Sequence, residues 1–350
     1  MGRLPRLDLK LRANLDPHVV IVGAGASRAA APLGDRFGRS LPLMADLVDT
    51  VGLGPLLDSE GIKWVDCDFE TLFQDLTKSG AHTALIRSIE SAITAYFQSL
   101  LIPEKPTVYD YLLLGLREKD VIATFNWDPF LVQAYKRNVH VKRLPQIVFL
   151  HGNVAIAICV SCRAKGFYGN TCTRCSRPLA PTTLLYPVGN KNYTSDPFIA
   201  GEWEILRNAL KEAYLLTIFG YRAPSSDAEA IELLRSGWEQ NGAHELAEIE
   251  IVDIRPEENV LPSWEPFITS HHYGVAESLF QTLMCRYPRR SCEAFAFASL
   301  QQEPWRTNAI PSTFESLGAL QIWVSSLLME EEVQEKEGKP FSGLPNNIVV

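Results

Sequence analysis

The stretch that decides the expected fold of this chain is His18-Val19-Val20-Ile21-Val22-Gly23-Ala24-Gly25-Ala26-Ser27. A short apolar run of β-branched residues that ends in glycine is typical of a buried parallel strand. Gly23 and Gly25 let the backbone turn tightly and approach a ligand closely. Ser27 and the alanines at 29–31 suit the first turn of a helix, whose unpaired N–H groups favour a pyrophosphate. An ordinary strand-to-helix turn is the alternative.

The glycine pattern departs from the usual dinucleotide-binding fingerprint. Arg28 occupies the position where a third glycine is expected. No acidic residue ends a second strand about twenty residues further on, because Asp46 stands in a stretch that we expect to be helical. The turn is therefore best described as Gly-Ala-Gly-x-Ser.

The composition limits the classes of protein to which this chain can belong. Its 350 residues include 46% hydrophobic and 21% charged residues, which is ordinary for a globular protein with a sizeable core. The net charge of −8 argues against a dedicated nucleic-acid binder. No apolar run is long enough to span a bilayer, and the N-terminus lacks the hydrophobic region of a signal peptide. We therefore expect a cytoplasmic protein.

Polar side chains follow two further predicted strands. Residues 121–125 precede Asn126 and Asp128, and residues 146–150 precede His151. Because open α/β sheets bind ligands at the carboxyl ends of parallel strands, these three residues are candidate catalytic groups. A histidine titrates near neutral pH and therefore suits a general base. Alternatively, Asn126 and Asp128 cap the next helix, and His151 is structural.

Two more predicted strands, at 213–219 and 250–254, end in groups that suit hydrogen bonds to a ribose or a phosphate. These groups are Gly220, Ser225, Ser226, Asp227 and Asp253. Capping of the helices and turns that follow is the alternative for them. A sixth strand is expected around residues 267–269, and residues 274–284 are expected to form the last helix of the core.

Four of the seven cysteines form two closely spaced pairs, Cys159-x-x-Cys162 and Cys172-x-x-Cys175. Such pairs supply the four thiolates of a structural Zn²⁺ site, which has no open position for catalysis. Disulfides and unligated thiols are the alternatives, and a reducing compartment disfavours disulfides. The segment 151–195 contains five Lys or Arg residues and no Asp or Glu. These cations can offset the negative charge of the metal site; a contact with nucleic acid is the less favoured explanation.

The remaining segments are predicted to be mainly helical. Phe69, Leu72, Phe73 and Leu76 share one face of a helix that Asp68 can cap, and Glu70 is expected to be a solvated charge. A helix after the capping-box spacing of Ser312 and Glu315 has a broad apolar face, which packs on the core or on a partner. The acidic run at 330–337 is expected to be solvated.

Five motifs in a fixed order resemble the sirtuin superfamily over residues 18–284. They are the Gly-Ala-Gly-x-Ser turn, Thr124-x-Asn126-x-Asp128, His151-Gly152, the two Cys-x-x-Cys pairs and the strand-glycine-serine turn at 213–226. Within the superfamily the chain is more similar to the prokaryotic branch associated with antiphage defence. The features shared with that branch are Asp68-Phe69-Glu70, Trp203, Gly220-Tyr221 and Ser226-Asp227.

Two departures separate the chain from the sirtuins that deacylate proteins. Those enzymes carry Gly-Ile-Pro-Asp-Phe-Arg after the first turn, where this chain has GDRFGR at 34–39. They also carry Phe-Gly-Glu after the zinc module, where the acyl-lysine peptide pairs, and this chain has LYPVG at 185–189. Both departures weaken the expectation of a peptide substrate.

The resemblance implies an α/β fold with a Rossmann-like parallel sheet. Residues 1–150 and 196–284 would form the NAD-binding domain, with a helical insert at about 36–118. Residues 151–195 would form a small zinc-ribbon module with four cysteine ligands. Residues 285–350 would form a C-terminal helical extension with an acidic tail.

The resemblance also assigns roles to residues at the strand ends. The pyrophosphate of NAD would lie at Gly23, Ala24, Gly25 and Ser27. Asp128 would hold the nicotinamide carboxamide, Asn126 would position a water or a ribose hydroxyl, and His151 would act as a base toward the nicotinamide ribose.

The function implied is an NAD⁺ glycohydrolase that releases nicotinamide and ADP-ribose. An NAD-dependent protein-lysine deacylase and a non-catalytic sensor of NAD or ADP-ribose are the alternatives. Free NAD hydrolysis is harmful to a host, so we expect gating by assembly, as a homo-oligomer, or by a partner. The resemblance implies a HerA-like ATPase or an Argonaute-type protein as that partner, without direct binding of nucleic acid by this chain.

Overall fold

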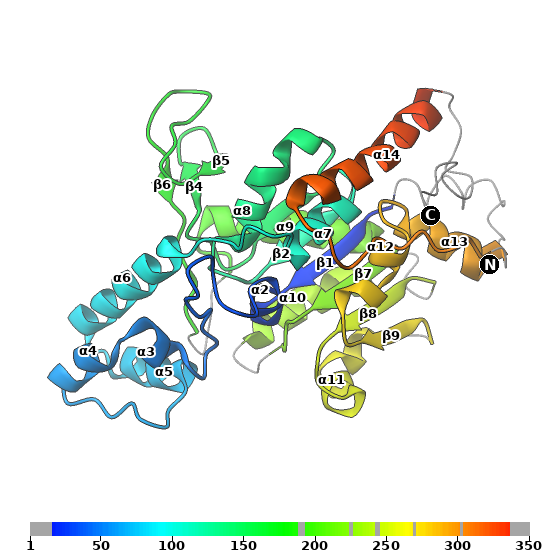
Figure 1. Ribbon diagram of the computed structural model, residues 1–350. Helices are drawn as coiled ribbons and strands as arrows, with labels where there is room; N and C mark the ends of the chain where they lie inside the picture. Colours follow the sequence, from blue (N-terminus) through cyan, green and yellow to red (C-terminus); the bar gives the residue numbers. More distant parts are fainter. Residues whose placement is uncertain are drawn as a thin grey trace.

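The computed structural model describes residues 16–187, 193–223, 227–241, 246–268, 271–301 and 304–336. A six-stranded sheet, parallel throughout, forms the centre of the described chain (Figure 1). Its strands are β1 (His18–Val22), β2 (Val121–Thr124), β3 (Gln146–Phe149), β7 (Leu215–Phe219), β8 (Glu248–Val252) and β9 (Tyr273–Ala276). The predicted Rossmann-like α/β fold is therefore confirmed.

The order of the strands fixes where a ligand can bind. Across the sheet the order is β3-β2-β1-β7-β8-β9. From β1 the chain adds β2 and β3 toward one edge of the sheet, and from β7 it adds β8 and β9 toward the other edge. Val22 at the end of β1 is level with Thr124 of β2 and Phe219 of β7. The loops that follow these three strands consequently meet at one edge, where the strand order reverses, which is the usual ligand site of such sheets.

Helices cover both faces of the sheet. On one face lie α2 (Ala24–Ala30), α7 (Val108–Gly115) and α8 (Phe130–Asn138), which ends in the short 3-10 helix η1 (Val139–Val141). On the other face lie α9 (Pro197–Glu212), α10 (Ala228–Glu239) and α11 (Glu257–Trp264). Side chains of β1 alternate between these two cores, with Val20 and Val22 in the first and Val19 and Ile21 in the second. This double burial explains why β1 is apolar at successive positions.

The helical insert lies between β1 and β2 in sequence. It contains α3 (Leu47–Val51), α4 (Gly54–Ser59), α5 (Phe69–Ser79) and α6 (Thr83–Ser99), and it precedes α7. The predicted cap of α5 is confirmed, because Asp68 accepts a hydrogen bond from Thr71 N at 3.0 Å. The apolar face of α5 is buried as predicted.

The cysteine pairs belong to a separate small sheet and its loops, which stand apart from the central sheet in Figure 1. Its antiparallel strands β5 (Ala164–Phe167), β4 (Ile156–Cys159) and β6 (Ala180–Pro181) are arranged in that order. This sheet and its loops, residues 156–182, form the metal-binding module.

Two predictions about the end of the core are wrong. Residues Glu265–Phe267 form a 3-10 helix, η3, and the sixth strand is β9. Pro266 stands in the first turn of η3, where its missing N–H costs no hydrogen bond, whereas β9 is a short edge strand without a continuous apolar run. The expected helix at 274–284 is likewise replaced by the end of β9, by η4 (Leu279–Gln281) and by α12 (Leu283–Arg286).

The C-terminal segment packs on the core through α13 (Ser291–Gln301) and α14 (Leu317–Lys336). Helix α14 begins later than the spacing of Ser312 and Glu315 predicted, and Ser316 Oγ accepts the N–H of Ala319 at 3.2 Å. Leu320 and Val324 on α14 are buried in the first core, and Leu327 is also buried, as the core-packing alternative predicted.

The expectation that the whole acidic run is solvated is wrong for Glu331. This carboxylate is 1% exposed and forms two bonds with the buried Arg289, Nε–Oε1 at 2.5 Å and Nη2–Oε2 at 2.9 Å. The charge pattern of the run could not show which glutamate faces inward, because Arg289 is distant in sequence. Within the described part of the chain, no helix combines the length and the apolar character that a membrane crossing needs.

Candidate active site

A cavity of about 420 Å³ lies at the edge where the strand order reverses. The loops after β1, β2, β3 and β7 and residues of the helical insert form its walls. The candidate residues that line it are Gly23, Ala24, Gly25, Asn126, Asp128, His151, Gly220 and Asp227. The structure thus gathers residues that are up to about 200 positions apart in sequence into one site.

Three glycines allow the loops after β1 and β7 to touch. A Cβ on Gly23 would lie 2.6 Å from Gly220 O, and a Cβ on Gly25 would lie 2.8 Å from Gly220 Cα. Gly220 itself has a φ of +62°, and its Cβ would lie 2.3 Å from Ala26 N. The N–H groups of Gly23 and Gly25 donate to Phe219 O at 3.0 Å and to Gly220 O at 2.9 Å. These two N–H groups therefore join the two loops. The sequence had instead predicted that this turn contacts a ligand.

The hydrogen bonds of Asn126 determine which atom of its amide faces the cavity. Asn126 Nδ2 donates to Gly23 O at 2.8 Å and to Ser27 Oγ at 2.9 Å, and it lies 3.1 Å from Tyr109 Oη. Because both hydrogens of the amide point into the protein, Oδ1 is the atom available to a ligand. Asn126 thus presents a hydrogen-bond acceptor to the cavity.

Asp128 lies behind Asn126 in the same network. Its Oδ2 accepts from Ser27 Oγ at 2.6 Å, and its Oδ1 accepts from Phe130 N at 3.0 Å. Asp128 therefore binds the first N–H of α8 from the residue before the N-cap, which is Pro129, so the predicted side-chain cap at the N-cap position is wrong. Asp128 also lines the cavity. Burial raises the pKa of Asp128 to about 6, against an ordinary value of 3.8. A buried carboxyl without a cation partner at hydrogen-bonding distance is costly to ionise, which is typical of functional sites.

His151 follows β3 and lines the same cavity. Its Nε2 lies 3.0 Å from Tyr193 Oη, and its ring is nearly perpendicular to that of Phe125, at 83° with centroids 4.8 Å apart. Burial raises the pKa of Tyr193, so its hydroxyl remains protonated at neutral pH. When Nε2 carries the imidazole proton, it donates to Tyr193 Oη and leaves Nδ1 as the basic nitrogen of the ring. The ring of His151 is therefore held in place on one side and lines the cavity on the other.

An aromatic wall connects these groups to Asp227. Phe125 and Tyr221 stack with centroids 4.1 Å apart and an interplanar angle of 8°. Tyr221 Oη donates to Asp227 Oδ2 at 2.8 Å. Both rings line the cavity, and aromatic side chains are common in sites that receive a base or a pyridine ring.

Some predicted site residues lie elsewhere. Ser27 is fully buried beneath the cavity, where it bridges Asn126 and Asp128. Asp253 accepts two side-chain hydrogen bonds from Arg255 and is not among the described residues that line the cavity. Ser225 and Ser226 lie outside the described residues.

Sequence reasoning missed several residues of the site. Tyr109, from α7, lies 2.5 Å from Ser27 Oγ and supports Asn126, yet nothing in its sequence surroundings distinguishes it from a core tyrosine. Tyr193 is similarly unmarked in the sequence. Glu70 was expected to be solvated, but it lines the cavity beside Asp68. The only available signal was that Glu70 belongs to the Asp-Phe-Glu triplet shared with the defence-associated branch.

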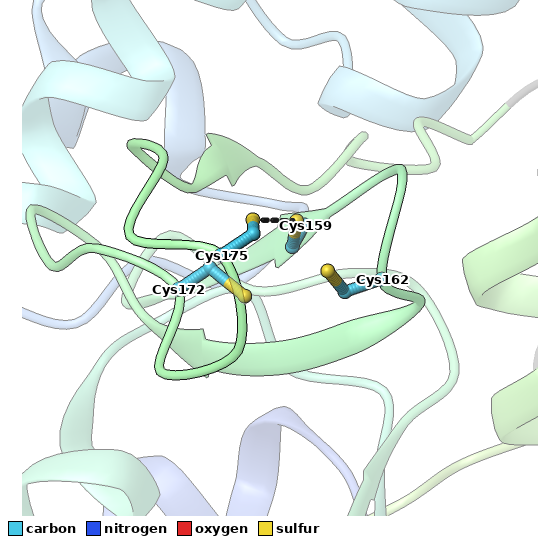
Figure 2. Close-up of side chains that lie close together, drawn as sticks. All are labelled: Cys159, Cys162, Cys172 and Cys175. Atoms are coloured by element: carbon cyan, nitrogen blue, oxygen red, sulfur yellow. Dashed lines mark hydrogen bonds between the residues drawn. The ribbon is translucent and has the colours of Figure 1, made fainter.

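The four cysteines of the metal-binding module lie together, as Figure 2 shows. All four sulfur atoms lie within 4.8 Å of one another, and none forms a disulfide. Tetrahedral Zn²⁺ with bonds of about 2.3 Å separates its sulfur ligands by about 3.8 Å, so the cluster fits a structural zinc ion. Arg177 Nε donates to Cys175 Sγ at 3.4 Å and lowers the pKa of that thiol to about 6. Lys165 instead pairs with Glu202, at 2.8 Å.

No family model matches the chain, and no curated protein matches it. Among solved structures, it is similar to a Sir2 bound to acetylated peptide, with 15% identity over 85% of this chain and 98% of that chain and a TM-score of 0.38. It is also similar to a Sir2 homolog in complex with NAD, with 13% identity over 86% of this chain and 96% of that chain and a TM-score of 0.35. At these values the similarity assigns neither a family nor an activity to this chain.

Proposed function

We propose that this chain is a sirtuin-like NAD⁺ glycohydrolase, which cleaves NAD⁺ to nicotinamide and ADP-ribose. The observation that carries the proposal is the acceptor Oδ1 of Asn126, which faces the same cavity as His151 at the reversal of strand order. The order of the sequence motifs and the aromatic wall formed by Phe125 and Tyr221 also support a pyridine dinucleotide as the substrate.

In cleavage of the bond between nicotinamide and ribose, the main task of the protein is to orient NAD⁺ and water. The bond between the ribose C1′ and the nicotinamide nitrogen breaks, and its electron pair neutralises the pyridinium as nicotinamide leaves. Water then adds to the oxocarbenium carbon, and one proton is released. Asn126 Oδ1 would accept a hydrogen bond from that water or from a ribose hydroxyl, and His151 would take up the proton. Asp128 would fix the network behind Asn126 or hold the carboxamide of nicotinamide.

Two features favour water over an acyl-lysine as the nucleophile. The Phe-Gly-Glu sequence with which deacylating sirtuins bind their peptide is absent after the metal-binding module. Leu185 and Pro187 line the cavity at this place, and Leu185 N donates to His151 O at 3.0 Å. The N–H of Leu185 is thus already engaged next to His151 and is not available to pair with a peptide strand.

Release of nicotinamide from NAD⁺ by the purified chain, with and without an acetylated peptide, tests the proposal. Hydrolysis predicts nicotinamide and ADP-ribose in both samples, whereas deacylation predicts an acetylated ADP-ribose only when peptide is present. Asn126→Ala and His151→Ala should each abolish release without loss of secondary structure. His140→Ala, at an exposed histidine, is the matched control and should retain activity. Tight binding of NAD⁺ without turnover in any sample would instead favour a sensor.

A role in antiphage defence, gated by a homo-oligomer or by a HerA-like or Argonaute-type partner, is part of the same proposal. It rests on the sequence resemblance alone. Cellular NAD⁺ should then fall only when the chain and its activating partner are expressed together. A constant NAD⁺ content under every combination would oppose this part of the proposal and leave the assay on purified protein unaffected.

A further inference from the structure

We propose that Asn153 is a positioning residue that couples the metal-binding module to the loop carrying Asn126 and Asp128. The proposal rests on the proposed function only for its kinetic test. Asn153 is 1% exposed and is not among the described residues that line the cavity. It therefore acts on the site through other residues.

The side chain of Asn153 holds the loop after β2 from behind. Its Nδ2 donates to Asn126 O at 3.1 Å and to Asp128 O at 2.7 Å, so that one amide group bridges the carbonyls on either side of Trp127. Its Oδ1 accepts from Ala155 N at 2.9 Å, which fixes the orientation of the amide. In addition, Val154 N donates to Trp127 O at 3.0 Å. All three carbonyls of the loop are thus bound by residues 153 and 154.

The backbone of Asn153 is in turn bound to the metal-binding module. Asn153 N donates to Thr182 Oγ1 at 3.1 Å, and Thr182 Oγ1 donates to Asn153 O at 2.9 Å. Thr182 follows β6, which pairs with β4, and β4 ends at the metal-site residue Cys159. Gly152 has a φ of +74°, and a Cβ there would lie 2.0 Å from Thr183 O, so the two segments approach as closely as backbone allows.

These contacts form a continuous connection from the cysteine cluster to the cavity. A metal ion that orders β4 and β6 holds Thr182, Thr182 holds Asn153, and Asn153 sets the carbonyls of Asn126 and Asp128. Because the side chains of those two residues project from the same backbone, loosening of the connection would move the acceptor Oδ1 of Asn126. A displacement of about 1 Å in a reacting group can cost about 100-fold in rate. A shift of that size in Asn126 Oδ1 would therefore lower the rate of NAD⁺ cleavage strongly.

Asn153→Asp tests the connection with little change in volume. The carboxylate cannot donate to either carbonyl and places negative charge against both of them. We expect the kcat for nicotinamide release to fall about 10- to 100-fold, while the KM for NAD⁺ changes by less than about threefold. Asn241→Asp is the matched control, since Asn241 Nδ2 also donates to two buried carbonyls, Leu210 O at 2.9 Å and Ala213 O at 2.7 Å, away from the cavity. It should leave kcat unchanged.

Thr182 provides a second, milder test. Thr182→Val keeps the shape and loses the hydroxyl, whereas Thr182→Ser keeps the hydroxyl. The valine variant should lower kcat and the serine variant should restore it, a rescue that a purely steric role would not produce. Equal kcat values in the two variants would overturn the proposed route through Thr182.

Hydrogen exchange measured by mass spectrometry tests the connection without reference to activity. Asn153→Asp, and removal of the metal from the wild-type chain with a chelator, should each speed exchange in the peptide spanning 126–131. Asn241→Asp should not do so. Unchanged exchange in that peptide would refute the coupling, even if the chain hydrolyses NAD⁺. Absence of NAD⁺ hydrolysis with accelerated exchange would instead refute the proposed function and leave the coupling intact.

Discussion

The buried carboxyl of Asp128 gives the most quantitative prediction of this structure. Burial raises the pKa of Asp128 from 3.8 to about 6. The folded chain therefore binds this proton more tightly than the unfolded chain does. The associated stability is fully present below pH 3.8 and is lost as the pH rises through about 6. The difference between the two pKa values corresponds to about 3 kcal/mol of unfolding free energy.

The variant Asp128→Asn removes this titration. It also loses one hydrogen bond, to Ser27 or to Phe130, at a cost of about 1–3 kcal/mol that does not depend on pH. We therefore expect the stability of the variant relative to wild type to improve by about 2 kcal/mol between about pH 4.5 and pH 8, which is the part of the titration inside that window. At the same time nicotinamide release should be lost.

Urea unfolding of both chains at several pH values measures the difference, and titrations common to both chains cancel. Glu250→Gln is the matched control. Glu250 is a partly buried residue whose pKa is raised to about 7 by desolvation, and it accepts from Leu283 N at 2.7 Å without lining the cavity. It should show a similar gain with pH and retain activity. Parallel pH curves for wild type and Asp128→Asn would refute the argument.

Three further outcomes are expected. Gly220→Ala should lower the free energy of unfolding by more than the roughly 1–2 kcal/mol that a left-handed backbone conformation costs a residue with a Cβ, because this Cβ would lie 2.3 Å from Ala26 N. Gly38 has a φ of +78° and open space around it, so Gly38→Ala should cost only that conformational energy. Thermal unfolding measures both variants. Cys172→Ser should abolish stoichiometric zinc measured by mass spectrometry, and Cys67→Ser, outside the cluster, should retain it. Glu331→Gln leaves Arg289 buried without its anionic partner and should cost about 3 kcal/mol in urea unfolding, whereas the exposed Glu332→Gln should cost almost nothing.

The candidate site could be predicted in outline because strand ends carry local signals. An apolar run followed by glycine, or by Asn126 or His151, marks the end of a buried strand whatever lies next to it in space. The fixed spacing of the four cysteines gives an equally local signal. Tyr109 and Asn153 have no such signal, because each matters only through hydrogen bonds to loops between 17 and 82 residues away.

The sequence by itself determined the parallel strands β1, β2, β3, β7 and β8, the capped helix α5 and the clustering of cysteines, because each depends on neighbours within a few residues. Only the tertiary structure decided that β9 forms one edge of the sheet and that Glu331 is buried against Arg289. It also decided that the amide of Asn126 turns its oxygen toward the cavity. Each of these depends on partners supplied by distant parts of the chain, and the free energy of burying a polar group is set by those partners.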